Sequence, residues 1–315
     1  SEHYLSLEGT HDILRQLRAI LDEYDAFTVG ETVFVTPKLA HDLCDKERGE
    51  LNMVFSFEHM ECDQYFLKWF KRKFRPQVFF NCLVKWQEEL EWNTIYLENH
   101  DQPRSILRFG SEAYWKESGK LLATLVLTLR GTPFLYQGQE IGMVDFDFTG
   151  MDQLDDVESH NVDRVLRRFH IPSKLRWKII RRTSRDNART PCQWDGSPNG
   201  GFTTGTPWLG VNGNYQTINL AAQEGDPDSI WNWYKSLSAL RRGSDVLRRG
   251  DFIPLEAGKQ VFAYRRQLGE KRLTIVLNFS DRPVQAPYKG ALVRSNYART
   301  SFDGSMGPWE AVILG

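Results

Sequence analysis

The amino-acid sequence predicts an α/β fold of the β/α-barrel type, followed by a small antiparallel β domain. Short apolar runs alternate with helical spacings, with about 25 to 40 residues per unit, as parallel strand–helix units require. Each run ends in polar or ionisable residues, and the carboxyl ends of the strands are where such barrels gather their functional groups. Beyond Gly243 the pattern changes to the alternation that is typical of β-strands.

The N-terminal segment contains the first two of four predicted units. Apolar residues at helical spacing predict a helix over residues 10–24, for which Thr10 is a suitable N-cap. A short apolar run over residues 26–29 predicts a buried strand, and it ends in Gly30 and Glu31. A second buried strand is expected over residues 51–57. Glu31 is therefore the first candidate for chemistry.

The third and fourth units follow the same plan. The charged stretch from Trp69 to Trp86 is expected to be helical and to lead into a strand over residues 94–97. An apolar helix is expected over residues 119–130. A fourth strand over residues 133–138 then ends in Gln139 and Glu140.

The strand at residues 94–97 breaks abruptly into polar groups, and Pro103 prevents it from continuing. Asn99, His100 and Asp101 stand where the functional groups of a barrel strand are expected. The alternative is that His100 and Asp101 belong to an ordinary turn. These residues alone do not decide between the two interpretations.

The remaining chain divides into loops, one helix and strands. Residues 145–228 are rich in Asp, Asn, Gly, Thr and Pro and predict long surface loops, which usually shape a pocket. A basic stretch over residues 164–182 is better explained as the solvated face of one helical connection than as a nucleic-acid site. Helical spacing returns at residues 229–242, so we expect domains at 1–242 and 243–315.

Composition excludes several classes of function. Forty Lys and Arg against 41 Asp and Glu leave a formal charge of −1, which favours neither nucleic acid nor an anionic membrane. The four scattered cysteines lack the spacing of a disulfide framework or a zinc site. The sequence contains no apolar run long enough to predict a membrane span, and Ser1 to Tyr4 do not resemble a signal peptide. We expect a cytoplasmic protein without metal or cofactor that binds a small neutral substrate.

Four ordered motifs carry a resemblance to a known family. They are Thr28–Thr32 (TVGET), Asn99–Arg104 (NHDQPR), Gly131–Met143 (GTPFLYQGQEIGM) and Ser184–Asp195 (SRDNARTPCQWD). Together they resemble glycoside hydrolase family 13, and more narrowly its oligo-1,6-glucosidase and α-glucosidase subfamily. The similarity extends from the first helix to the C-terminal β domain.

The resemblance assigns roles to five residues. It makes Glu31 the general acid/base and Asp101 the carboxylate that stabilises the transition state, while His100 binds the same glucose unit. A general acid must stay protonated in a desolvated pocket, whereas the stabilising carboxylate must stay ionised. An arginine of the fourth motif closes the pocket, and Arg185 and Arg189 both remain candidates. The alternative for both arginines is loop-anchoring ion pairs with neighbouring aspartates.

One expected group is missing. A retaining glycosidase uses a second, nucleophilic carboxylate, which the family carries at its fourth strand in a Gly-Phe-Arg-x-Asp type motif, and this motif is absent. The resemblance therefore implies strands 5 to 8 of a (β/α)8 TIM barrel, the C-terminal half, followed by a β-sandwich. A separate N-terminal half is an expected partner.

The implied reaction is hydrolysis of terminal α-1,6 or α-1,4 glucosidic bonds in isomalto- or malto-oligosaccharides, with retention and without a cofactor. Two alternatives stay open. The chain is an inactive truncated or structural half that needs its complement, or it is a relative of sucrose isomerases and transglucosidases. The segment Arg108-Phe109-Gly110 lacks the Arg-Leu-Asp-Arg-Asp type sequence of sucrose isomerases, which favours hydrolysis.

Overall fold

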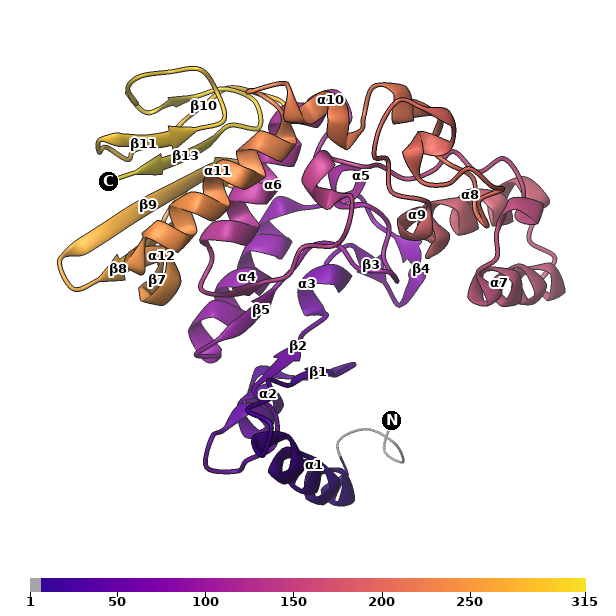
Figure 1. Ribbon diagram of the computed structural model, residues 1–315, viewed down its shortest axis with the longest axis horizontal. Coiled ribbons are helices and arrows are strands. Elements are labelled where there is room, and N and C mark those ends of the chain that lie inside the picture. Colours follow the sequence, from indigo (N-terminus) through magenta and orange to yellow (C-terminus); the bar gives the residue numbers. More distant parts are fainter. Residues whose placement is uncertain (1–6) are drawn as a thin grey trace.

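The computed structural model describes residues 7–315 and is shown in Figure 1. Ser1 to Tyr4, on which part of the signal-peptide prediction rests, lie outside the described residues. The N-terminal helices and the first two strands form a small lobe, the central helices form the body, and the C-terminal strands form a sheet at one side of it (Figure 1). None of the helices in residues 7–315 combines the length and apolarity needed to cross a bilayer.

Four short strands run in the same direction through the lobe and the body. They are β1 (Val29–Glu31), β2 (Met53–Phe55), β5 (Asn93–Ile95) and β6 (Gly131–Pro133). β1 pairs in parallel with β2, and β5 pairs in parallel with β6. Side-chain hydroxyls connect the two pairs, because Thr94 donates to the Val54 carbonyl at 3.0 Å and Tyr96 donates to the Ser56 carbonyl at 2.8 Å. Each predicted strand has a counterpart of three residues, but only β2 lies within its predicted range. β5 begins one residue early, and β1 and β6 share only Val29 and Pro133 with the predicted runs. β1 and β6 lie at the two ends of the row.

Helices alternate with these strands and continue beyond them. The α-helices are α1 (Glu8–Asp22), α2 (Pro37–Cys44), α3 (Glu58–Glu61), α4 (Pro76–Glu89), α5 (Ser105–Phe109), α6 (Trp115–Thr128), α7 (Val157–Arg168), α8 (Ser173–Thr183), α9 (Asp186–Arg189), α10 (Leu220–Glu224), α11 (Ile230–Gly243) and α12 (Asp245–Arg249). Short 3-10 helices are η1 (Gln139–Ile141), η2 (Met151–Gln153), η3 (Pro198–Gly201) and η4 (Gly213–Gln216). The prediction of Thr10 as an N-cap was wrong, because α1 begins two residues earlier, after Leu7.

The helical prediction from Trp69 onward was also wrong at its start. Residues 64–71 form an antiparallel hairpin of β3 (Gln64–Tyr65) and β4 (Leu67–Lys71). Trp69 is the one buried side chain of β4, at 8% exposure, and it packs against Phe148 and Ile180. Because only one aromatic side chain of this charged strand points inward, its apolar/polar alternation is too short to distinguish a strand from a helix.

Residues 145–228 are more ordered than the sequence predicted. The basic stretch forms α7 and α8, two helices rather than one connection. They are separated by His170, whose φ is 57°, and by Pro172, which stands at the N-cap of α8. A left-handed residue followed closely by proline ends one helix and begins the next.

The C-terminal segment forms two β layers. A five-stranded antiparallel sheet has the order β11-β13-β9-β8-β7, and β10 and β12 form a separate two-stranded sheet that packs on it through Met306 and Val284. The strands are β7 (Asp251–Leu255), β8 (Val261–Leu268), β9 (Lys271–Asn278), β10 (Val284–Gln285), β11 (Leu292–Ser295), β12 (Ser305–Met306) and β13 (Ala311–Leu314). Gly269 lies in the turn between β8 and β9 with a φ of 58°, a backbone conformation that glycine adopts without strain.

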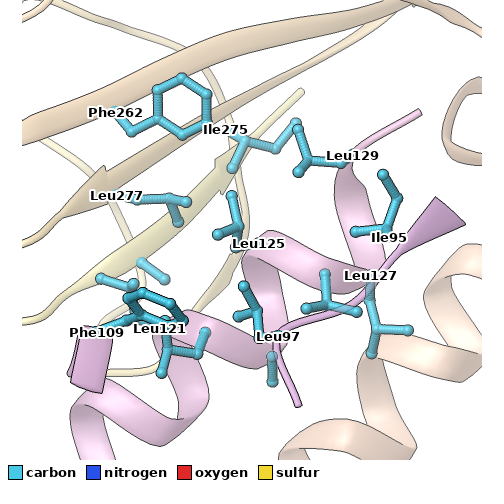
Figure 2. Packing of buried hydrophobic residues seen from close by; sticks show 14 of the residues in the cluster. Ile95, Leu97, Phe109, Leu121, Leu125, Leu127, Leu129, Phe262, Ile275 and Leu277 are labelled. Atoms are coloured by element: carbon cyan, nitrogen blue, oxygen red, sulfur yellow. The ribbon is translucent and has the colours of Figure 1, made fainter. Parts of the chain in front are cut away.

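The core lies where α6 packs between the C-terminal sheet and β5 (Figure 2). Leu125 of α6 is fully buried and lies near Ile275 and Leu277 of the sheet, while Ile95 lies on the other side of the helix. Phe262 extends this cluster by stacking on Phe80 of α4, with ring centroids 4.8 Å apart. One apolar cluster therefore joins the C-terminal sheet to α4, α6 and β5.

Leu125→Ala is expected to lower the free energy of unfolding by about 2–5 kcal/mol, because it leaves a cavity in a core that cannot fully collapse. Urea denaturation followed by circular dichroism measures the change. Leu175→Ala is the matched control, since Leu175 of α8 is 47% exposed and its truncation is expected to cost less than about 0.5 kcal/mol. Equal effects of the two substitutions would contradict the assigned core.

Candidate active site

A pocket of about 230 Å³ lies at the carboxyl ends of the four parallel strands. Glu31 and His100, both predicted as site residues, line this pocket together with Glu98 and Asn99. Its remaining lining is largely aromatic and apolar, and consists of Phe55, Phe57, Tyr96, Phe134, Leu135 and Tyr136. A small apolar cavity with a few convergent polar groups is the usual form of a small-molecule site.

Glu31 is the last residue of β1 and lies opposite Phe55 in the register with β2. Its side chain is exposed. The desolvated pocket expected around a general acid is therefore not provided by residues 7–315. The physical reason is the position of β1 at the end of the strand row, where β2 covers one side only.

His100 and Asp101 lie in a turn after β5, as the alternative interpretation allowed. The Asn99 side chain accepts a hydrogen bond from the Asp101 backbone N–H at 2.9 Å, which forms an Asx turn. His100 Nε2 lies 3.6 Å from Asp101 Oδ2, and the His100 side chain is 61% exposed. The turn leaves both side chains accessible, at 61% and 32% exposure. His100 lines the pocket, whereas Asp101 is not among the residues that line it.

Both candidate arginines reach Asp101. Arg189 Nη2 donates to Asp101 Oδ1 at 2.7 Å, and Arg185 Nη1 lies 3.4 Å from the same oxygen. Arg189 also donates from Nε to the His100 carbonyl at 2.8 Å. The two side chains come from α9 and its N-cap residue, one turn apart. Two guanidinium groups therefore surround one carboxylate and balance its charge.

Asp156 is a site residue that sequence reasoning missed. It caps the N-terminus of α7, and its carboxylate accepts from Arg185 Nε at 2.9 Å and Nη2 at 2.6 Å and from Ser159 Oγ at 2.8 Å. Burial works to raise the pKa of Asp156, but these hydrogen bonds outweigh it and hold that pKa below its ordinary value. Asp156 thus fixes the arginine that faces Asp101.

A second buried aspartate stands behind the arginines. Asp186 Oδ2 accepts the backbone N–H groups of Asp155 and Asp156 at 2.8 and 2.9 Å, and its Oδ1 lies 4.0 Å from Arg189 Nη1. Burial raises the pKa of Asp186. The loop-anchoring ion pair that was left open as the alternative therefore exists between Arg189 and Asp186, at the limit of contact, in addition to the contacts with Asp101.

Glu98 and Arg104 form a fully buried ion pair beneath the pocket, with Arg104 Nη1 2.9 Å from Glu98 Oε2. Glu98 Oε1 accepts from the backbone and the hydroxyl of Ser105 at 2.9 and 2.6 Å. The Arg104 backbone N–H donates to Asp145 at 2.7 Å, and burial raises the pKa of Asp145 to about 7. A glutamate directly after an apolar run and an arginine six residues later were the available signals for this pair.

No group of three or more histidine, cysteine or acidic side chains suited to a metal ion occurs among the described residues. His59, next to Glu61 and Cys62, is buried and bonds the Tyr96 carbonyl at 2.9 Å. Burial lowers the pKa of His59 to about 4. This histidine belongs to the packing below the pocket.

Comparison with known proteins shows the family. The profile of the alpha-amylase catalytic domain matches residues 2–250, so the chain belongs to the alpha-amylase family, glycoside hydrolase family 13, with a TIM-barrel-type α/β fold. The oligo-1,6-glucosidase of Parageobacillus thermoglucosidasius is 41% identical over 333 aligned residues, which cover 99% of this chain and 59% of that protein.

Solved structures of similar fold support the same family. The isomaltulose synthase of Klebsiella sp. LX3 superposes with a TM-score of 0.93 at 32% identity, covering 98% of this chain and 58% of that one. The trehalose-6-phosphate hydrolase of Bacillus licheniformis gives 0.89 at 34% identity, covering 96% and 58%. The chain therefore spans about three fifths of the length of these relatives.

Asp156→Asn is expected to lower the free energy of unfolding at pH 7 by about 1–3 kcal/mol, because a charged hydrogen bond to Arg185 is lost. The folded pKa of Asp156 lies below the unfolded value of about 3.9. Its contribution is therefore complete above the unfolded pKa and is lost as pH falls through the folded pKa. Urea denaturation between pH 7 and pH 3 should show the two proteins converging.

Asp155→Asn is the control, since the Asp155 side chain is exposed next to Asp156. Its effect is expected to stay within about 0.5 kcal/mol at every pH. A constant difference between the parent and Asp156→Asn across this range would contradict the charged interaction.

Proposed function

We propose that this protein contributes the acid/base residue and the stabilising carboxylate of an α-glucosidase that cleaves terminal α-1,6 or α-1,4 glucosidic bonds in short gluco-oligosaccharides with retention. The observation that carries the proposal is Asp101 held between Arg185 and Arg189, beside a pocket lined by His100 and Glu31. A relative named oligo-1,6-glucosidase supports the linkage and the substrate class.

The chemistry divides among these residues. Glu31 gives a proton to the glycosidic oxygen as the bond breaks and later removes one from the attacking water. Asp101, held by its two arginines, stabilises the positive charge that develops on the sugar. His100 donates a hydrogen bond to a sugar hydroxyl. No organic cofactor takes part in these steps.

The nucleophile has no counterpart in this chain. We propose that β1, β2, β5 and β6 are strands 5 to 8 of an eight-stranded barrel, and that the nucleophilic aspartate belongs to a complementary N-terminal half. Retaining glycosidases place their two carboxyl groups about 5–5.5 Å apart. Asp101 is already paired with two arginines and serves as the stabilising group, so it does not replace the nucleophile.

Sucrose isomerisation is the second candidate function, and the similarity to an isomaltulose synthase favours it. The segment that argues against it in the sequence lies at the end of α5. There Arg108 pairs with the buried Asp63 at 2.6 Å and does not line the pocket. Hydrolysis remains the proposal because this segment differs from the sequence of sucrose isomerases.

The free cysteines Cys44, Cys62, Cys82 and Cys192 support a reducing, cytoplasmic location.

The purified 315-residue chain is expected to release no glucose from isomaltose or from an aryl α-glucoside, because it lacks the nucleophile. The same chain fused to the N-terminal part of the Parageobacillus oligo-1,6-glucosidase is expected to release it. Glucose release in a coupled assay and aryl release by absorbance measure both. Robust turnover by the chain alone would overturn the assignment of a missing nucleophile.

In the fused protein, Glu31→Gln is expected to lower kcat by about 10²–10⁴-fold while substrate still binds, because proton transfer is lost. Steady-state kinetics and calorimetric titration with isomaltose test this. Glu61→Gln is the control: Glu61 is a half-buried glutamate whose pKa is raised by burial, but it lies outside the pocket. Loss of binding in Glu31→Gln would point instead to a structural role.

A further inference from the structure

Helices α7 and α8 contact each other and form a strongly basic hairpin. Residues 157–183 contain eight arginine and lysine residues against two acidic residues, a formal charge of +6. The formal charge of −1 for the whole chain conceals this local excess. Figure 1 shows α7 at the opposite end of the molecule from the C-terminal sheet, so the excess is concentrated at one end. A surface whose charges share one sign attracts a partner of the opposite sign.

Both acidic residues of the hairpin already have partners. Asp163 is buried and accepts from Arg167 Nε at 2.7 Å and from Arg176 Nε at 2.8 Å. Glu158 pairs with Lys68 of β4. Five exposed basic side chains of the hairpin form no ion pair with any carboxylate that the structure describes, namely Arg164, Arg168, Lys174, Lys178 and Arg182. Their charges are therefore available to an external partner.

Apolar side chains stand among these charges at the tip of the hairpin. Phe169 directly follows the last residue of α7 and is 70% exposed. Val165, one turn before Phe169, and Leu175, in the first turn of α8, are 53% and 47% exposed. His170 follows Phe169 with a φ of 57°, which ends α7 and turns the chain toward α8. The tip therefore presents three apolar side chains to solvent.

The opposite side of the hairpin packs on the body of the protein. Ile180 of α8 is fully buried in an apolar cluster with Trp69 and Phe148, and Val162 and Trp177 pack against the same cluster. This packing fixes the hairpin in place. The exposed apolar side chains at the tip are additional to it, and exposed apolar surface rimmed by charge marks an interaction site in a soluble protein.

We propose that the tip of the α7–α8 hairpin docks this protein on a bilayer surface that carries anionic lipids. The unpaired basic side chains contact the headgroups, while Phe169, Val165 and Leu175 enter the boundary between headgroups and acyl chains. The contact is peripheral, because none of the helices in residues 7–315 has the length and apolarity to cross a bilayer.

The combination of charge and apolar tip selects a bilayer over a nucleic acid. Arg168 and Lys174 are the sequence neighbours of Phe169 and Leu175, so these apolar side chains each have a cation beside them. A nucleic acid binds the cations, but the aliphatic side chains of Val165 and Leu175 cannot stack on its bases as aromatic side chains do. An anionic bilayer binds both kinds of side chain. This inference does not depend on the proposed function.

Cosedimentation of the full 315-residue protein with lipid vesicles tests the proposal. The probes are vesicles of phosphatidylcholine alone and vesicles that also contain about one quarter phosphatidylserine. Binding is expected only to the anionic vesicles, and it should weaken at least about tenfold between about 0.1 and about 0.5 M salt, because salt screens the attraction. Arg168→Glu with Lys174→Glu is expected to weaken binding at least about tenfold. Phe169→Ala is expected to weaken it at least about threefold and to keep the salt dependence, because only an apolar contact is lost.

Lys271→Glu with Arg272→Glu is the matched control, because it makes the same change of charge at two exposed residues of β9, in the C-terminal sheet at the other end of the molecule. It is expected to change binding by less than about twofold, and circular dichroism should show that all variants stay folded. Equal binding to neutral and anionic vesicles, or equal losses in the hairpin and control variants, would overturn the proposal. Parent-like binding by Phe169→Ala, together with displacement of the vesicles by a short duplex DNA, would also overturn it, because the hairpin would then be a nucleic-acid surface.

Discussion

The site depends most on the contacts of one buried side chain, the guanidinium group of Arg104. It is buried, pairs with Glu98 at 2.9 Å, and donates to the carbonyls of Gln137 at 2.8 Å and Ala188 at 3.2 Å. One side chain thereby ties the loop after β5 to the loop after β6 and to α9. Breaking a buried pair by removing one partner typically costs about 3–5 kcal/mol, because the other charge stays behind unpaired. The loop after β5, the loop after β6 and α9 are therefore held in fixed relative positions by Arg104.

The position of α9 follows from this constraint, and with it the charge balance around Asp101. The Ala188 carbonyl that Arg104 binds lies between Arg185 and Arg189, so fixing this carbonyl fixes both arginines. Asp156 then holds Arg185 from behind. The arginine side of the site is complete within the described residues. Glu31, the proposed general acid, is exposed.

Apolar runs were sufficient to locate the four parallel strands to within a few residues. The signal is contiguous for β2 and β5, which are buried along most of their length, whereas β1 and β6 are only partly buried. They did not reveal the β3–β4 hairpin, where Trp69 is the one buried residue of β4. Asp156 was missed for a different reason, because its importance comes from a contact with Arg185, 29 positions away. The motif resemblance pointed to the residues at the pocket, whereas the buried acids behind them became visible only through tertiary contacts.

The exposed Glu31 and the exposed apolar side chains of α1, among them Leu17 and Ile20, have one common origin. Glu31 ends β1, and α1 precedes the same strand, so both lie at the end of the row where pairing stops. A strand paired to the free edge of β1 would place backbone and side chains beside Glu31 and remove water from it. A helix attached to that strand would cover Leu17 and Ile20. In the proposed barrel, the desolvation that a general acid requires and the burial that the apolar side chains of α1 require would both come from that strand and its helix.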